Sequence, residues 1–124
     1  MRMVHSEKAP KAIGPYSQAI SVDKLLFCSG QIPLNPETME IVGNTIETQT
    51  EQVLRNMAAV LAAEGLTPAK VVKTTVFLKD FNDFAKMNAV YEKFFDGHKP
   101  ARSTVEVSRL PKDVSVEIEC IASY

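Results

Sequence analysis

Residues 101–123 read ARSTVEVSRLPKDVSVEIECIAS and contain the clearest structural signal in the chain. Apolar and polar residues alternate strictly in two segments, Arg102–Val107 and Val114–Ala122. Alternation with a period of two is typical of half-buried β-strands, so both segments are predicted to be strands. The residues between them, 108–113, include Pro111 and are predicted to form a loop.

The polar faces of these two predicted strands carry charges of both signs. If the strands pair as a hairpin with a symmetric loop, Arg102 faces Glu119 and Thr104 faces Glu117. Glu117 is then diagonal to Arg102 and within reach of its long side chain. This polar face, on which Glu106 also lies, would meet either water or another subunit. In the second case its charges would need partners.

Three further strands are predicted upstream. Ser17–Val22 and Leu25–Ser29 are short apolar runs on either side of Asp23-Lys24, which indicates a hairpin. Residues 33–45 are predicted to be a loop, with a possible short edge strand near residues 40–42. Val71–Leu78 is rich in β-branched residues and predicts a strand with one mostly buried face. The residues expected on that face are Val72, Thr74, Val76 and Leu78.

Two amphipathic helices lie between these strands. The first has apolar residues at three- and four-residue spacing, and Gly65 marks its end. Its start is marked by a capping box, for which two pairs qualify, Thr48 with Glu51 and Asn44 with Glu47. The second helix begins at a cap, Asp80 or Asn82, and runs to about Asp96. The apolar stripes are Val53, Leu54, Met57, Val60 and Leu61 in the first helix, and Phe84, Met87, Tyr91, Phe94 and Phe95 in the second.

The aromatic stripe of the second helix allows two interpretations, a cofactor-binding surface and a packed core. Helical spacing favours core packing. Together the elements follow the order ββαβαββ. Helices this amphipathic are expected on one face of a mixed sheet, which gives an α+β fold in a single domain spanning residues 1–124.

Composition excludes several classes of function. The chain has 14 basic and 15 acidic residues, so the basic excess of a nucleic-acid binder is absent. Cys28 and Cys120 lie among apolar residues and are predicted to be buried free thiols, which is typical of a cytoplasmic protein. His5 and His98 are isolated, so no metal site is expected. No apolar run is long enough for a signal peptide or a membrane span, and no Gly-rich loop indicates a nucleotide cofactor.

Short motifs along almost the whole chain, from about Ala9 to Ala122, occur in the order found in a known family. They are Ile13–Gln18, Ser29–Pro33, Val72–Phe77, Asn88, Pro100–Ser103, Arg109–Asp113 and Val116–Glu119. Each motif alone is weak, but in register they form a specific pattern. The sequence therefore resembles the Rid family of reactive intermediate deaminases, also called YjgF-like.

The resemblance implies a homotrimer of chorismate-mutase-like subunits, with clefts at the subunit interfaces that bind small carboxylates. It implies hydrolysis of 2-imino and 2-enamino acids, such as 2-aminoacrylate and 2-iminobutyrate, to 2-oxo acids and ammonia. No metal or cofactor is implied. The residues matching the family's catalytic positions are Arg102, which binds the carboxylate, Glu117, which holds or activates water, and Tyr16. The residues matching its remaining substrate-binding positions are Ser29, Gly30, Asn88 and Thr104.

These residue types suit the implied reaction. A guanidinium binds a carboxylate bidentately and stays charged, so Arg102 can hold a 2-imino acid in place for attack by water. Glu117 can accept a proton from that water if burial raises its pKa, whereas a nearby Arg102 would lower it. Thr104 departs from the family, because many members have cysteine there. A role that needs a thiol is therefore not expected, although the backbone N–H of Thr104 can still bind a carboxylate.

The same residues also allow purely structural roles. Arg102 and Glu117 or Glu119 could form only a cross-strand ion pair, and Tyr16 could only pack a turn. The chain could also be a non-catalytic module that binds 2-oxo acids. Single-strand ribonuclease activity, attributed to some relatives, is disfavoured by the near-neutral charge and by the lack of a histidine pair.

Overall fold

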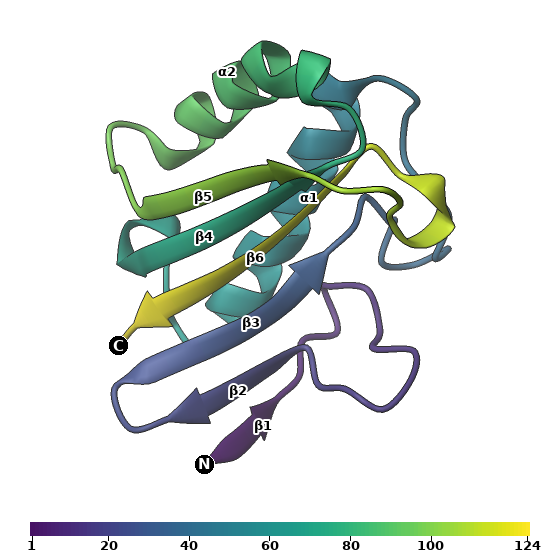
Figure 1. Cartoon of the computed structure of the whole chain (residues 1–124). Helices are drawn as coiled ribbons and strands as arrows, with labels where there is room; N and C mark the ends of the chain where they lie inside the picture. The colour runs from purple at the N-terminus through teal and green to yellow at the C-terminus, as the bar shows by residue number, and fades with distance from the viewer.

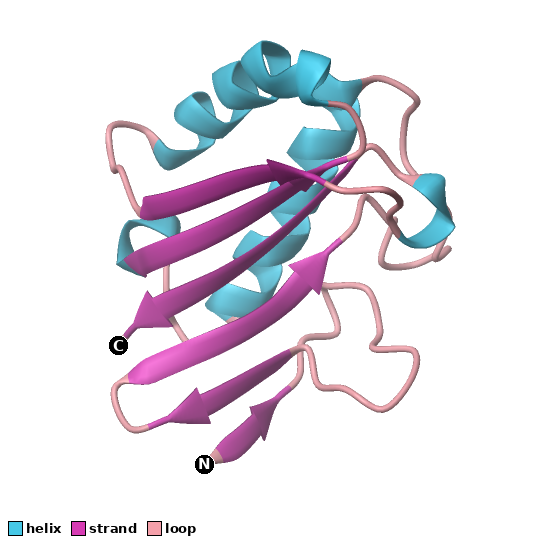
Figure 2. Cartoon of the chain, in the orientation of Figure 1, coloured by secondary structure: helices cyan, strands magenta, loops and turns pink.

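The computed structural model describes residues 1–124 and has an α+β architecture, in which two helices cover one face of a six-stranded sheet. The other face, here called the open face, lies toward the viewer and carries no helix (Figures 1 and 2). The strands are β1 (Arg2–Val4), β2 (Ala19–Val22), β3 (Leu25–Gln31), β4 (Val71–Leu78), β5 (Ala101–Glu106) and β6 (Val116–Ser123). The helices are α1 (Ile46–Ala62) and α2 (Phe84–Phe95), and short 3-10 turns span Pro68–Lys70, Phe81–Asp83 and Pro111–Asp113.

The predicted order of elements is confirmed, with one additional short strand, β1, at the N-terminus. The edge strand expected near residues 40–42 is only a single bridge between Leu34 and Ile41. The sheet has the order β1-β2-β3-β6-β4-β5, and only the β4–β5 pair is parallel. A parallel pair needs a crossover connection, and α2 supplies it.

The predicted hairpin between the last two strands is wrong. β6 lies between β3 and β4, and β4 separates it from β5. The cause is the different burial of the two strands. Val116, Ile118 and Cys120 are buried, so β6 needs neighbours on both sides, whereas no residue of β5 is fully buried and the strand lies at the edge.

The predicted polar face is therefore split between the two sides of the sheet. Thr74 of β4 is the Cα partner of both Arg102 and Cys120. Arg102 thus lies on the same side as buried Cys120, facing the helices, and Thr104 and Glu106 follow it. Glu117 and Glu119 point to the open face. A shift of one residue in register moves all side chains of a strand to the opposite face. The assumed hairpin aligned Arg102 with Glu119, whereas in the sheet Arg102 is aligned with Cys120 through Thr74.

Two smaller predictions are also corrected. Helix α1 is capped by Thr45 rather than by Asn44 or Thr48, and the side chains and backbones of Thr45 and Thr48 form a reciprocal capping box. Val72 is exposed, although it was expected on the buried face of β4. A register shift between Val71 and Lys73 explains this, because Val71 takes the inward position.

The core lies between the sheet and the helices. Its largest fully buried side chains include those of Leu54, Met57 and Leu61 from α1 and Met87 from α2, as the apolar stripes predicted. Cys28 and Cys120 are confirmed as buried free thiols, and they are direct cross-strand partners. No helix of the chain combines the length and apolar composition that crossing a membrane requires.

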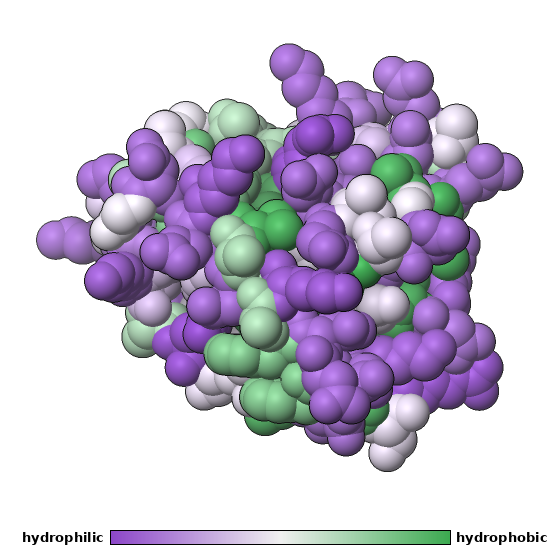
Figure 3. Space-filling view, turned by 90° about the horizontal axis from the view of Figure 1, so that it is seen from above, coloured by the Kyte–Doolittle hydropathy of each residue, from purple (hydrophilic) through white to green (hydrophobic).

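Seen from above, the surface on the side of α2 is mostly hydrophilic, as expected for the outer side of an amphipathic helix, with a strip of hydrophobic residues across it (Figure 3). The open face is different, because Leu25, Phe27 and Val105 are partly exposed on strands β3 and β5. A sheet with helices on one side only leaves such residues uncovered in a single copy of the chain.

Candidate functional site

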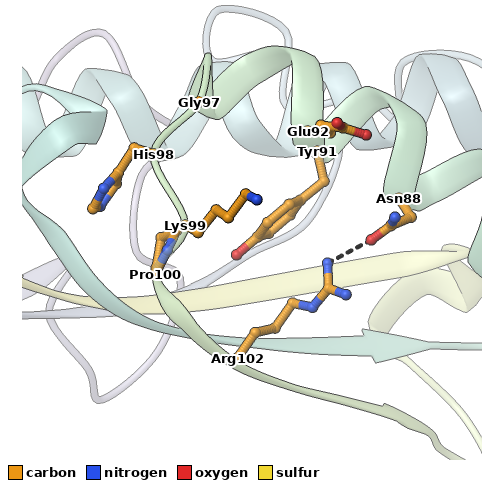
Figure 4. Close-up of a pocket in the computed structure, with 8 residues that line it drawn as sticks. All are labelled: Asn88, Tyr91, Glu92, Gly97, His98, Lys99, Pro100 and Arg102. Atoms are coloured by element: carbon orange, nitrogen blue, oxygen red, sulfur yellow. Dashed lines mark hydrogen bonds between the residues drawn. The ribbon is translucent and has the colours of Figure 1, made fainter.

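The predicted site residues fall into two separate pockets. The first, here called the Arg102 pocket, has a volume of about 430 Å³ and lies between α2, the segment after it and β5. Figure 4 shows the side chains of Asn88 and Tyr91 descending from α2 toward Arg102, which rises from β5. The lining residues are Asn88, Tyr91, Glu92, Gly97, His98, Lys99, Pro100 and Arg102.

The Arg102 guanidinium rests in a cradle formed by one face of α2. Its Nη1 donates a hydrogen bond to Asn88 Oδ1 at 2.7 Å. Its Cζ lies 4.8 Å from the ring centroid of Tyr91 and 5.5 Å from that of Phe84. The three helix residues are spaced i, i+4 and i+7, which places them on one stripe. The predicted aromatic stripe therefore packs the core and also holds a cation.

Arg102 has no acidic partner. The three ion pairs of the chain are Arg2–Glu64, His5–Glu7 and Arg109–Asp113. Half-buried charges in proteins are normally paired, and a guanidinium has five N–H donors, of which Asn88 accepts from one. Unpaired N–H donors on a fixed cation can bind an anion, and the planar shape of a guanidinium fits a carboxylate.

Tyr91 is anchored from below. Its hydroxyl and Thr74 Oγ1 share a hydrogen bond of 2.7 Å, and both residues are buried. Burial raises the pKa of the Tyr91 hydroxyl, while the Thr74 hydrogen bond and the charge of Arg102 oppose that rise. Tyr91 is therefore a neutral phenol beside the cation.

Thr104 follows Arg102 on the same side of β5. Its hydroxyl oxygen is buried and has no hydrogen-bond partner. An unpaired buried hydroxyl is costly and uncommon in proteins. Thr104 thus marks a second unsatisfied polar group close to the Arg102 pocket.

The second group of predicted residues lines a pocket, here called the Glu117 pocket, where β3 ends and β6 begins. It has a volume of about 310 Å³. Its lining residues are Tyr16, Ser29, Gly30, Ile32, Pro111 and Glu117. A neighbouring cavity of about 310 Å³ shares four of these residues and therefore adjoins the Glu117 pocket.

Gly30 and Glu117 fit each other closely. A Cβ at position 30 would collide with the carboxyl group of Glu117, so a larger residue there would force that side chain out of its present position. Gly30 lies where the β3–β6 register shifts between Cys28 and Gln31, which bends β3 beside the carboxylate. Gly30 and Glu117, which belong to separate motifs of the sequence, therefore lie side by side in the structure.

The environment of Glu117 favours its protonated form. Burial raises the pKa of its carboxyl group, and the negative charge of Glu119 raises it further. No hydrogen bond or ion pair stabilises the charged form within the chain. Both causes of the raised pKa lie near the carboxyl group of Glu117, and Arg102 of the same chain is not among the groups that shift it.

Ser29 and Tyr16 build the rim of the Glu117 pocket. The Ser29 hydroxyl donates a hydrogen bond of 2.6 Å to the carbonyl oxygen of Ser17, and the Ser29 N–H donates to the Gln18 carbonyl oxygen. These bonds tie the Gly14–Ser17 loop to β3. Tyr16 remains half exposed at the pocket, and its hydroxyl accepts a long hydrogen bond of 3.4 Å from the Ile13 N–H.

One chain does not bring all the predicted residues together. Arg102, Asn88 and Thr104 lie on the helix side of the sheet, whereas Tyr16, Ser29, Gly30 and Glu117 lie at the other pocket. β4 separates the strands that carry Arg102 and Glu117. Arg102 and Glu117 are therefore not a cross-strand ion pair, and that alternative is excluded.

Sequence reasoning missed several lining residues. Tyr91 was assigned to the core alone, and Lys99 and His98 were not considered for the site. Lys99 lies three residues before Arg102, so the Lys-Pro-Ala-Arg sequence could have indicated it. His98 Nε2 lies 2.7 Å from the Val71 carbonyl oxygen and fixes the segment that leads into β5.

Comparisons with known proteins agree on one family. A protein-family model described as endoribonuclease L-PSP matches residues 6–124. A RutC family protein of Pyrococcus horikoshii is 58% identical over 120 residues, which cover 97% of this chain and 95% of that protein.

Two solved structures show the same fold over the whole chain. The Rid-family protein YyfA from Yersinia pestis has a TM-score of 0.96 and 52% identity, and the match covers 99% of this chain and 98% of the other. E. coli TdcF, solved with bound serine, has a TM-score of 0.95 and 45% identity, with coverage of 100% and 99%. At such identities the similarity extends to sequence as well as fold.

Proposed function

Because the chain belongs to the YjgF/Rid family that the endoribonuclease L-PSP model describes, we propose that it hydrolyses small 2-imino and 2-enamino acids to 2-oxo acids and ammonia. The observation that carries this proposal is the half-buried Arg102 guanidinium, which is held in place and has no acidic partner. Serine bound to E. coli TdcF is a small molecule with a carboxylate, the group that such a cation recognises.

The reaction needs a carboxylate clamp and a proton acceptor. Arg102 holds the substrate carboxylate, which places the C=N carbon for attack by water. Water adds to the carbon of the protonated imine, Glu117 accepts a proton from that water, and a carbinolamine forms. Glu117 then returns the proton to the nitrogen. As the C–N bond breaks and ammonia leaves, the carbinolamine hydroxyl gives its proton back to Glu117 and becomes the C=O group of the 2-oxo acid. A pKa of Glu117 above the usual value makes it a better base than an ordinary glutamate.

The two functional groups can meet only if two copies of the chain share a site. We therefore propose a homotrimer in which the Arg102 pocket of one subunit adjoins the Glu117 pocket of the next. A heterologous contact of this kind closes into a ring, and each interface then holds one complete site. The exposed apolar residues of the open face, Leu25, Phe27 and Val105, supply surface for such an interface. Static light scattering should give three times the chain mass of 13.7 kDa.

The direct test is the decay of 2-aminoacrylate or 2-iminobutyrate made in place by a dehydratase. We expect the protein to accelerate release of the 2-oxo acid and ammonia above the spontaneous rate. Free imines already hydrolyse readily, so the protein needs to lower the activation free energy only modestly. Each tenfold increase in rate requires about 1.4 kcal/mol. A folded trimer that leaves the decay unchanged would contradict the proposal.

A second experiment tests the shared site. Arg102→Ala and Glu117→Gln trimers are each expected to lose most of their activity, but mixed trimers contain interfaces with an intact Arg102 from one chain and an intact Glu117 from the other. If the two variant chains are mixed in equal amounts and exchange randomly, about one quarter of all interfaces combine an intact Arg102 with an intact Glu117. Activity recovered on mixing supports the shared site. Inactive mixtures, with subunit exchange demonstrated, would contradict it.

The TdcF complex also supports a second candidate, a module that binds small carboxylates without turning them over. It predicts saturable binding of 2-oxobutyrate with no effect on imine decay. RNA cleavage, which the name of the family model suggests, has less support from this chain. Its net charge is −1, and phosphate-rich partners require a basic excess.

A further inference from the structure

We propose that Tyr91 is a positioning residue, whose ring, together with that of Phe84, holds the Arg102 guanidinium ready for a ligand carboxylate. The inference rests on the proposed function, in which Arg102 binds that carboxylate. It adds a role for the aromatic stripe of α2, which otherwise serves only the core.

The contacts around Arg102 are of two kinds. Asn88 fixes one nitrogen through a hydrogen bond of 2.7 Å. The Tyr91 and Phe84 rings lie 4.8 and 5.5 Å from Cζ, within the range in which a ring face attracts a cation. In Figure 4 the guanidinium lies between Asn88 and the Tyr91 ring. Its remaining N–H groups are free for a ligand.

Tyr91 is itself held in a fixed place relative to Arg102. Its hydroxyl is hydrogen-bonded to Thr74, and its ring packs on Phe95 at 4.6 Å between centroids. Thr74 is the Cα partner of Arg102 in the parallel β4–β5 register. The sheet register that places Arg102 therefore also places the Tyr91 ring beside it, through the buried hydrogen bond to Thr74.

Aromatic rings suit this task better than a carboxylate would. A carboxylate would neutralise the guanidinium and compete with the substrate for its N–H groups. A ring face stabilises the cation but leaves its charge and its donors available. Arginine loses considerable rotamer freedom when it is fixed, so a cradle that orders it beforehand strengthens ligand binding.

The experiment compares three variants of the whole protein. Tyr91→Leu removes the ring face and keeps an apolar side chain, whereas Tyr91→Phe keeps the ring and removes only the hydroxyl. Phe94→Leu is the matched control, because Phe94 is an aromatic residue of the same helix that does not contact Arg102. Thermal unfolding and light scattering check that each variant is folded.

Titration with 2-oxobutyrate gives the first readout. We expect Tyr91→Leu to raise Kd about five- to tenfold, in line with a cation–π contact at a partly desolvated site, and Tyr91→Phe and Phe94→Leu to stay within about twofold of wild type. During turnover the loss should appear in KM more than in kcat, because the carboxylate is held in both the ground and transition states. NMR of the arginine side chains should show a ring-current shift of Arg102 that Tyr91→Leu abolishes and Tyr91→Phe retains.

Three results would overturn the inference. They are an unchanged Kd in Tyr91→Leu, an equal loss in Tyr91→Phe, which would assign the effect to the hydroxyl, and an equal loss in Phe94→Leu, which would assign it to helix packing. If wild type binds no 2-oxobutyrate, the proposed function fails and this inference falls with it. If wild type binds and Tyr91→Leu binds equally well, this inference alone fails.

Discussion

The Arg102 pocket and the Glu117 pocket each contain one half-buried charged residue without a partner of opposite charge, but they treat it in opposite ways. Arg102 is held by an amide and two aromatic rings of α2. Glu117 makes no hydrogen bond within the chain, and both burial and Glu119 raise its pKa. The Arg102 pocket holds a permanent positive charge in a fixed position. The Glu117 pocket raises the pKa of a carboxyl group, so that this group binds a proton more readily.

This difference separates binding from proton transfer. A permanent cation with fixed donors suits a permanent anion, the substrate carboxylate. A carboxyl group whose pKa moves toward neutrality suits a proton that must be taken and returned. Variants at the two pockets should therefore change different kinetic quantities.

Arg102→Ala should produce the largest effect. Removing one partner of a desolvated charged contact costs about 2–5 kcal/mol, so we expect kcat/KM for 2-iminobutyrate to fall about a thousandfold and 2-oxobutyrate binding to become undetectable by calorimetry. Arg55→Ala, on α1 and exposed, is the control and should leave both unchanged. Retained binding in Arg102→Ala would place the carboxylate elsewhere.

Glu117→Gln should affect turnover without affecting binding. Loss of a general base typically reduces a rate by roughly 10²–10⁴, so we expect kcat to fall about a hundredfold while Kd for 2-oxobutyrate stays within about twofold. Glu119→Gln is the neighbouring control and should keep kcat near wild type. A Glu117→Gln variant that weakens binding as strongly as Arg102→Ala would remove the distinction between the pockets.

Gly30→Ala should reduce kcat about tenfold, because the new Cβ pushes the Glu117 carboxyl group aside and small misplacements of a reacting group are costly. Gly65→Ala serves as the control. Gly65 has a φ of 70° and open space around it, so alanine there should lower stability by about 1 kcal/mol and leave kcat unchanged. Full activity in Gly30→Ala would show that Glu117 tolerates another position.

The smallest effect concerns pH. The raised pKa of Glu117 means that activity should fall, as pH decreases, at a higher pH than for an ordinary glutamate. The folded state also holds this proton more tightly than the unfolded chain. The associated stability is therefore present below the ordinary glutamate pKa and lost as pH rises through the folded pKa.

Glu119→Gln removes the weaker of the two causes and should move the acid limb of the kcat profile to lower pH. Unfolding in denaturant across the same pH range should show a smaller loss of stability in Glu117→Gln than in wild type. An acid limb that does not move in Glu119→Gln would leave burial as the only cause of the shift.

The sequence predicted local features well, since these depend on residues close together in the chain. The periodicity of α1 and α2 and the alternation in β5 and β6 reflect which side chains must be buried. The motifs also singled out Arg102, Asn88 and Glu117, and each of these residues lines a pocket in the structure. Helix caps and β-bulges were predicted less well. The cap of α1 is Thr45 rather than Asn44 or Thr48, and a register shift at Val72 turns that side chain outward. Contacts with neighbouring elements decide such shifts of a single residue.

Taken alone, then, the sequence determined the element types, the α+β layer and the membership of the family. Only the tertiary structure decided which strands are neighbours. Alternation specifies that a strand has two faces, but the partner strand sets which face turns inward, and β4 rather than β6 is the partner of β5. That pairing turns Arg102 toward Tyr91 and away from Glu117, because Thr74 aligns with both Arg102 and Cys120.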